Sequence, residues 1–180
     1  MPKVVDHDAH RRDLAAQAAE VFSERGYSAL GMRELAEALG VSKSSLYHYF
    51  PGKEALFRAA TEHVVDQDWD PEGLPSAEAP AQERARALMD VIRQVEDRFP
   101  GELSLMVDYL RGRSPSEVRD DPCMELANRR FLELVTQVVG PADARSIASL
   151  LMGVLLQRFL DGRATSMDEV EEWLAGVLER

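Results

Sequence analysis

Apolar residues follow the 3.6-residue period of an α-helix along most of this chain, and no stretch alternates as a β-strand does. Glycine and proline residues interrupt the pattern at intervals, and serines stand at two of the expected helix starts. The pattern predicts an all-α fold of about nine helices. Their approximate positions are 9–25, 32–39, 43–50, 53–68, 82–99, 102–111, 122–139, 142–160 and 166–178.

The second and third predicted helices are short and are joined by a tight turn. Gly40 allows the left-handed backbone that such a turn needs, and the hydroxyl of Ser42 can cap the next helix. That helix has an apolar side with Leu46 and Phe50, and its opposite side is polar. The sequence therefore predicts a helix-turn-helix, although two short helices around a glycine also occur in many other α-helical proteins.

Two stretches lack helical periodicity and are rich in residues that break helices. Residues 69–81 contain three prolines and a glycine among small and acidic residues, which predicts a connecting loop. The polar sequence GRSPSEVRDDP, residues 112–122, predicts a second loop. We expect a small DNA-binding domain over residues 1–52 and a larger helical domain over residues 53–180.

Charge is distributed unevenly along the chain. The net charge is −11, which argues against a protein that binds nucleic acid without sequence preference, because such binding depends on phosphate neutralisation. Residues 1–63 hold 8 Lys and Arg against 9 Asp and Glu, and residues 64–180 hold 13 against 23. A nearly neutral module joined to an acidic body suits a sequence-specific DNA reader with a separate regulatory domain.

The remaining composition indicates a cytoplasmic protein without cofactors. A single cysteine, Cys123, cannot form an internal disulfide, and the longest apolar run is too short to span a membrane. Asp6, His7, Asp8 and His10 precede the first helix without a further ligand nearby, so we expect no metal site. No spacing typical of a catalytic triad or nucleophile elbow occurs, and we expect no enzymatic activity.

The segment from Leu14 to Ala59 carries a more specific signal. It reads AAEVFSERGY at the end of the first helix and MRELAEALGVSKSSLYHYFPGKEALF across the next three. These residues resemble the N-terminal domain of the TetR family of transcriptional repressors. The resemblance implies a homodimer that binds a palindromic operator and a C-terminal body that binds a small-molecule effector.

The resemblance also implies roles for particular residues of the helix-turn-helix. Lys43, Ser44, Tyr47 and His48 would face bases or the nearby backbone. Phosphate contacts would come from Ser42, Ser45, Tyr49 and Lys53, with Arg33 as a further candidate. Tyr49 also lies on the core side of its helix, so its hydroxyl has two possible environments. The chain departs from the family pattern at Leu30-Gly31, where relatives commonly place Ser or Thr, so one phosphate-binding hydroxyl is missing.

Two further sets of residues are candidates for the functions of the C-terminal body. The resemblance predicts a ligand cavity between the middle helices, lined by Met89, Ile92, Phe99, Met106, Tyr109, Cys123, Met124 and Phe131. Taken alone, each of these residues is more typical of an ordinary core. The last two helices carry a wide apolar surface, with Gly153 permitting close approach, which suggests a two-fold four-helix interface. Its residues would be Ile147, Leu150, Leu151, Val154, Leu155, Phe159, Trp173 and Leu174, although these helices could also simply close the monomer core.

The sequence therefore predicts a ligand-responsive, homodimeric DNA-binding repressor. Two alternatives remain open at this point. The chain could be a structural helical protein that does not bind DNA, or a regulator controlled by a protein partner instead of a small molecule.

Overall fold

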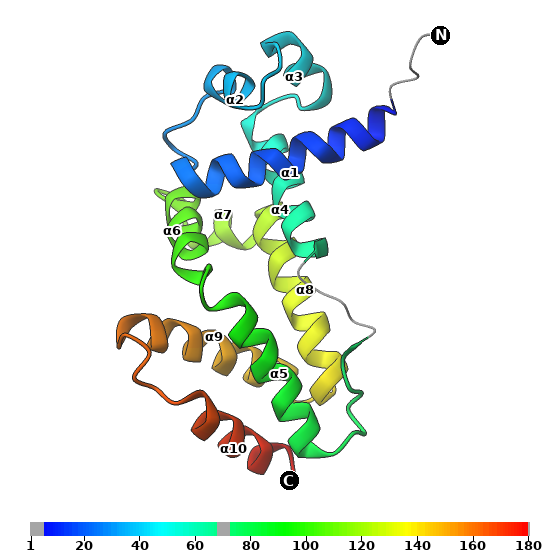
Figure 1. Cartoon of the computed structure of the whole chain (residues 1–180), viewed down its shortest axis with the longest axis vertical. Coiled ribbons are helices and arrows are strands. Elements are labelled where there is room, and N and C mark those ends of the chain that lie inside the picture. Colours follow the sequence, from blue (N-terminus) through cyan, green and yellow to red (C-terminus); the bar gives the residue numbers. More distant parts are fainter. Residues whose placement is uncertain (1–5, 68–72, 180) are drawn as a thin grey trace. The chain divides into compact units, whose positions relative to one another are not determined.

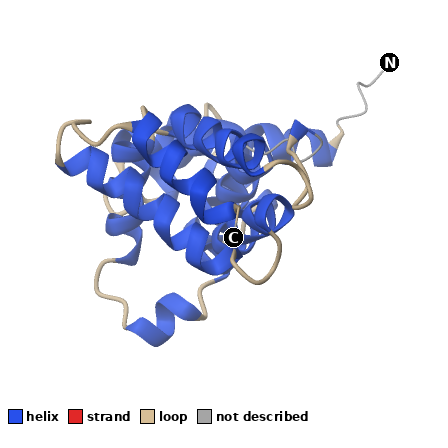
Figure 2. Ribbon diagram, turned by 90° about the horizontal axis from the view of Figure 1, so that it is seen from below, coloured by secondary structure: helices blue, strands red, loops and turns tan. Residues whose placement is uncertain are grey.

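The computed structural model describes residues 6–67 and 73–179, and within them the chain forms ten α-helices and no β-strand (Figures 1 and 2). The predicted all-α class is confirmed. The helices belong to two compact units, which are described separately below. The first contains Met1–Asp68 and Gly101–Ala127, and the second contains Trp69–Pro100 and Asn128–Arg180.

The first unit is built around α1 (His7–Arg25), which packs along α4 (Lys53–Gln67). Between them in sequence come the two short helices α2 (Met32–Ala38) and α3 (Lys43–Tyr49), which lie next to each other in Figure 1. The unit is completed by most of α6 (Phe99–Leu110), by α7 (Pro115–Arg119) and by the first turns of α8 (Pro122–Val139).

The turn between α2 and α3 is fixed by backbone hydrogen bonds. The Val41 amide donates to the Ala36 carbonyl at 3.0 Å, and the Gly40 amide donates to the Glu37 carbonyl at 3.2 Å. This pair of bonds is a Schellman motif, which requires a left-handed residue after the helix. Gly40 has a φ of +66° and meets that requirement without steric cost, as the sequence predicted.

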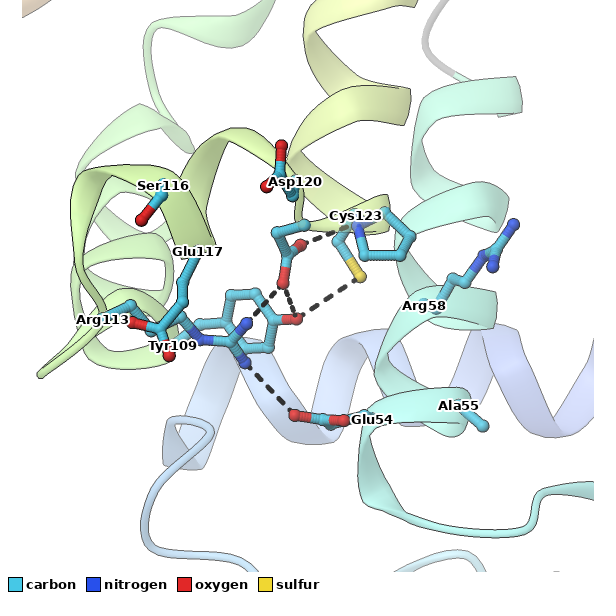
Figure 3. Close-up of a pocket in the computed structure, with 11 residues that line it drawn as sticks. Glu54, Ala55, Arg58, Tyr109, Arg113, Ser116, Glu117, Asp120 and Cys123 are labelled. Carbon is cyan, nitrogen blue, oxygen red and sulfur yellow. Dashed lines mark hydrogen bonds and ion pairs between the residues drawn. The ribbon is translucent and has the colours of Figure 1, made fainter.

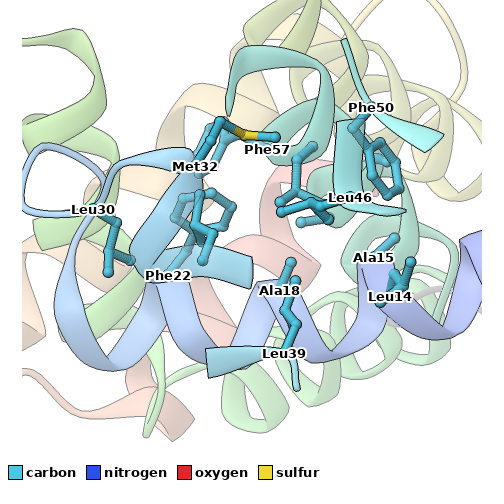
Figure 4. Packing of buried hydrophobic residues seen from close by; sticks show 14 of the residues in the cluster. Leu14, Ala15, Ala18, Phe22, Leu30, Met32, Leu39, Leu46, Phe50 and Phe57 are labelled. Carbon is cyan, nitrogen blue, oxygen red and sulfur yellow. The ribbon is translucent and has the colours of Figure 1, made fainter. Parts of the chain in front are cut away.

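The core of the first unit joins α1 to both short helices (Figure 4). Leu14, Ala18 and Phe22 are buried on α1, and Leu46 and Phe50 are buried against them from α3 and its C-terminal cap. Leu46 and Phe50 have no exposed surface. Burial of this apolar face, worth about 1.5–3 kcal/mol for each large side chain, fixes which side of α3 remains in solvent.

Two more contacts support the loop between α1 and α2 from elsewhere in the unit. Asp108 of α6 accepts a 2.6 Å hydrogen bond from the Ser28 amide, and this bond lowers the pKa of the carboxyl. Lys53, at the start of α4, donates to the Tyr27 carbonyl at 3.0 Å, and its ammonium lies 4.0 Å from the centroid of the Tyr27 ring. Burial is the main cause that raises the pKa of Tyr27 to about 12.

Three details of the helix prediction were wrong. The first helix, α1, begins at His7 with Asp6 as its cap, so His7, Asp8 and His10 lie within the helix and do not precede it. The stretch predicted as a polar loop contains α7, because Ser114 caps it, Pro115 occupies its first position and the Glu117 carboxylate accepts from the Ser114 amide. The fifth helix was predicted to continue to Phe99, but α5 ends at Val95 and α6 begins at Phe99. Pro100 lies in the first turn of α6, where its missing N–H leaves no intrahelical bond unmade.

The second unit consists of α5 (Ala81–Val95), the rest of α8, α9 (Ala144–Leu160) and α10 (Met167–Leu178). Helices α5 and α10 pack against each other, and Arg93 of α5 pairs with Asp168 and Glu171 of α10 at 3.1 and 3.0 Å. Within the described residues no single helix has the length and apolar composition to cross a membrane. Helices α8 and α9, which are bent against each other, have that length and composition only when taken together.

The compact units do not follow the predicted boundary after residue 52, because α4 packs along α1 inside the first unit. The restriction of DNA binding to residues 1–52 concerns function and stays a prediction. The predicted end of the fourth helix at Asp68 and the start of the predicted loop, through Glu72, lie outside the described residues.

Replacing Lys53 by Met tests how much its contact with Tyr27 stabilises the first unit. The alkyl stem is retained, but one hydrogen bond and one cation–π contact are lost, so we expect the free energy of unfolding to fall by about 1–2 kcal/mol. For a chain of this length the melting temperature should fall by about 2–8 °C. Thermal unfolding followed by circular dichroism measures this change.

Lys43→Met is the matched control, because Lys43 is exposed on α3 with its ammonium 5.7 Å from the Tyr47 ring centroid. We expect its melting temperature to stay within about 1–2 °C of the parent protein, as for most surface substitutions. Equal melting temperatures for the two variants would show that the Lys53 contact adds no stability.

Candidate nucleic-acid interface

The polar side of α3 is accessible to solvent along its whole length. Lys43, Ser44, Tyr47 and His48 are all exposed, and Tyr47 keeps 44% of its surface accessible although it follows the fully buried Leu46. The structure thus brings the residues that were expected to face bases onto one exposed surface. Their side chains offer an ammonium, hydroxyl groups and an imidazole, which are the groups that hydrogen-bond base edges and phosphates.

The first turn of α3 is held by Ser42, as the sequence predicted. The Ser42 hydroxyl accepts from the Ser45 amide at 3.0 Å and lies 3.0 Å from the Ser44 hydroxyl. Ser42 and Ser44 are exposed, whereas Ser45 is half-buried. A cap of this kind leaves the serine hydroxyl proton free to donate, so capping and phosphate contact are compatible at Ser42.

Tyr49 lies between α3 and the first turns of α1. Its hydroxyl is 3.0 Å from His7 Nδ1, and its ring meets His10 edge to face with the centroids 5.2 Å apart. The ring of His48 is also close, at 5.1 Å. Tyr49 is half-buried, so part of its surface stays accessible while it joins the two helices. No local sequence pattern could have indicated this contact, because His7 and Tyr49 are 42 positions apart.

The candidate phosphate ligands outside α3 differ in whether they already hydrogen-bond to other groups of the protein. Arg33 is exposed near the start of α2. Lys53 is half-buried and uses one N–H on the Tyr27 carbonyl, which leaves two donors of its ammonium for another acceptor. At Gly31 the amide donates to the Glu34 carboxylate at 3.1 Å, so the glutamate half of a capping box is present without a hydroxyl.

The predicted ligand-binding residues are divided between the two units. Met106 and Met124 border an apolar cavity of about 180 Å³ in the first unit, together with Phe22, Phe57 and Leu105. Tyr109 and Cys123 border a separate, polar cavity of about 830 Å³ in the same unit (Figure 3). Burial raises the pKa of the Cys123 thiol, which keeps it neutral.

The other predicted ligand residues lie in the second unit. Met89 and Ile92 are buried in its core, Phe99 is buried beside a small polar-edged cavity, and Phe131 is half-buried on α8.

The predicted dimerisation residues also fall into groups with different surroundings. Ile147, Leu151, Leu155 and Leu174 are buried within the second unit, and Leu150 and Val154 are half-buried. Phe159 and Trp173 are 47% and 54% exposed. Three apolar residues of α9 that the sequence reasoning missed are exposed as well, namely Met152, Leu156 and Leu160. The helical period identified the apolar helix but not which part of its circumference its own unit covers.

Comparisons with known proteins agree with this geometry. Residues 14–60 match the family model of bacterial regulatory proteins of the tetR family. Over 59 residues the chain is 46% identical to the transcriptional activator FasR of Mycolicibacterium smegmatis, an alignment that covers 33% of this chain and 27% of FasR. The chain thus spans about a quarter of the length of the first curated relatives that it matches.

Two longer matches extend beyond the helix-turn-helix. The transcriptional regulator BetI of Rhizobium meliloti is 27% identical over 176 residues, which cover 93% of this chain and 87% of BetI. The crystal structure of SCO7518 from Streptomyces coelicolor A3(2) superposes with a TM-score of 0.74 at 24% identity, covering 95% of this chain and 99% of that one. The helix-turn-helix segment of this chain thus matches the tetR family of bacterial regulatory proteins, and the chain shares its fold with SCO7518.

Proposed function

We propose that this protein is a transcriptional regulator, and not an enzyme, that acts in the cytoplasm by reading operator DNA with α3. The observation that carries the proposal is the exposed polar side of a short helix whose apolar side is fully buried. A helix held in this way can enter the major groove, with its N-terminal residues against base edges. Lys43 can donate to guanine O6 and N7, and Tyr47 offers a hydroxyl and a ring to hydrogen-bond a base or contact a thymine methyl.

Phosphate contacts would fix the orientation of α3 in the groove. Ser42 stands at its N-terminus, and Arg33 and Lys53 carry positive charge near the ends of neighbouring helices. Ser45 and Tyr49 complete the proposed set. Phosphate contacts position a protein on the duplex without reading the sequence. The nearly balanced charge of residues 1–63 keeps non-specific attraction low, so base contacts have to supply the selectivity.

We also propose that the protein acts as a homodimer on a palindromic site. The exposed apolar side chains of α9 and α10 support this, since Met152, Leu156, Phe159, Leu160 and Trp173 would bury a hydrophobic surface on association. Gly153 has open space around its α-carbon and permits close approach of a second helix. Two copies of α3 would then read major grooves about 34 Å apart, one turn of the duplex.

The regulatory signal is proposed to be a small molecule with an apolar body. The apolar cavity of the first unit supports this, because Phe22 of α1, Phe57 of α4 and Met106 of α6 all border it. A ligand that binds better to one arrangement of these helices than to another shifts the population between them. We propose that the ligand-bound arrangement holds DNA less tightly, so that the protein represses transcription until the ligand arrives.

Tyr47→Ala and Lys43→Ala test the role of α3. On a duplex enriched by the parent protein from a random pool, each variant should bind about 5- to 150-fold more weakly, because one good base contact is worth about 1–3 kcal/mol. Fluorescence anisotropy at fixed salt measures the affinity. Arg86→Ala is the charge-matched control, since Arg86 is an exposed cation on α5 in the other unit, and its affinity should be unchanged. Parent-like binding by both α3 variants would contradict the assignment.

Trp173→Glu tests the proposed dimer. Placing a carboxylate in an apolar interface leaves a buried charge without a partner, so we expect a shift from dimer to monomer at micromolar concentration. Light scattering coupled to size-exclusion chromatography measures the mass. Glu172→Ala, at the neighbouring exposed position, should remain dimeric. A monomeric parent protein would reject the dimer, whereas a dimeric Trp173→Glu variant would place its interface elsewhere.

Ala127→Phe tests the apolar cavity, which Ala127 borders. The compound is found by a thermal-shift screen of small aromatic and aliphatic molecules. If it binds only the folded protein, a concentration of 100 times its Kd stabilises the parent protein by about 2.7 kcal/mol. The filled variant should lose that shift, whereas Ala142→Phe, at an exposed alanine of the second unit, should keep it. Retention of the shift in Ala127→Phe would exclude this cavity as the effector site.

A further inference from the structure

The larger cavity of the first unit is polar and borders the first turns of α4. It has a volume of about 830 Å³ and is lined by residues of α4, α6, α7 and the segments around them (Figure 3). Its charged lining consists of four carboxylates, Glu54, Glu117, Asp120 and Asp121, and two guanidinium groups, Arg58 and Arg113. The excess of negative charge favours a cationic occupant over an anionic one.

Two of the four carboxylates accept hydrogen bonds from the protein itself. Asp121, with a side chain only 2% exposed, accepts from the Cys123 and Met124 amides and from the Tyr109 hydroxyl and Arg113. Glu117 accepts from the Ser114 amide and hydroxyl, both at 2.7 Å. Both oxygens of Asp121 are thus engaged, whereas the two bonds from Ser114 share one oxygen of Glu117.

The other two carboxylates remain largely free. The Glu54 side chain is 74% exposed, and one of its oxygens lies 3.3 Å from an Arg113 nitrogen. Asp120 is exposed at the end of α7. In Figure 3 Asp120 lies at the top and Glu54 at the bottom, with Tyr109 and Arg113 between them. Arg58, on the same cavity, is paired with Glu62 of its own helix at 3.1 Å.

Arg113 shows how this cavity holds a cation. Its guanidinium lies over the Tyr109 ring, 4.3 Å from the centroid, between Asp121 at 2.5 Å and Glu54 at 3.3 Å. The two contacts are unequal, because Asp121 is buried and Glu54 is mostly in water, where ion pairs are weak. A competing cation can therefore take Glu54 while Arg113 stays on Asp121 and Tyr109.

We propose that this cavity is a second ligand site, which binds a small organic dication such as an alkyl diamine or an amino-guanidine. One cationic end binds Glu54 in place of Arg113, and the other end binds Asp120. Aliphatic carbons between the two ends lie along Ala55 and Pro122, which also border the cavity. This site is separate from the apolar cavity, whose lining includes none of these residues.

Occupation of the site would act on α3 through the start of α4. Glu54 is adjacent to Lys53, which donates to Tyr27, and α3 ends only a few residues earlier. The Glu54–Arg113–Asp121 bridge therefore joins the first turn of α4 to the start of α8 within one unit. Releasing Glu54 removes this restraint and lowers the affinity for DNA; this second step rests on the proposed function.

Isothermal titration calorimetry of the full chain with agmatine, a guanidinium joined to an amine, tests the site directly. We expect saturable binding of one agmatine per chain in about 150 mM salt, where distant surface charges are screened. Glu54→Gln and Asp120→Asn should each raise the Kd by about fivefold, because each removes one exposed ion pair worth up to about 1 kcal/mol. Both side chains are exposed, so both variants should fold normally, which circular dichroism checks.

Glu125→Gln is the matched control, since it removes the same charge from an exposed position on α8 outside the cavity. Its Kd should stay within about twofold of the parent value, as for an independent surface site. Absence of binding, saturable binding of succinate in place of agmatine, or equal weakening by Glu125→Gln would each overturn the site.

A second measurement separates the site from its effect on DNA. With the selected duplex, agmatine should weaken binding by the parent protein at least about fivefold, the scale of a modest allosteric coupling. Glu54→Gln titrated in parallel should show no such loss, which excludes competition by agmatine bound to the duplex itself. If agmatine binds and DNA affinity is unchanged, the link to α3 is wrong and the site stands. If the protein binds no DNA, the proposed function fails while the calorimetry still decides the site.

Discussion

The structure depends on holding a seven-residue helix in place. An isolated helix shorter than about 12–15 residues is only marginally stable in water, so α3 cannot form by its own hydrogen bonds. It is held by the Ser42 cap, by the turn at Gly40 and above all by burial of Leu46 and Phe50 against α1. Because that apolar side must be buried, the opposite side must be exposed. The surface proposed to read DNA is thus a consequence of core packing.

The supporting elements of the first unit can be understood from the same requirement. Helix α2 is equally short and needs the same core, and the loop before it contains Tyr27 and Ser28. Lys53 fixes Tyr27 from α4, and Asp108 fixes Ser28 from α6. These contacts tie the loop to two longer helices. The position of α3 is therefore sensitive to changes in α4 and α6, which is a useful property in a regulator.

Local signals in the sequence were sufficient for most of the fold. Helical periodicity, Gly40 and Ser42 correctly predicted the helix-turn-helix, because caps and turns depend on neighbouring residues. The same signals marked α7, where Ser114 and Glu117 have capping-box spacing, but the polar composition of that stretch concealed them. Contacts between distant positions could not be predicted in this way. Periodicity predicts that a helix begins at Lys53, but it does not predict that the Lys53 ammonium contacts the Tyr27 ring.

The predicted ligand residues of the first unit are divided between two cavities, and the physical reason also concerns how a bound ligand would affect α3. Periodicity identifies apolar side chains but not the spaces between them, so Met106 and Tyr109, one turn apart on α6, were assigned to one cavity and border two. Phe22 and Phe57 belong to the core that supports α3, and they also border the apolar cavity. A ligand there would touch that core directly. Communication with the DNA surface then requires only a repacking of α1 against α4, within a single compact unit.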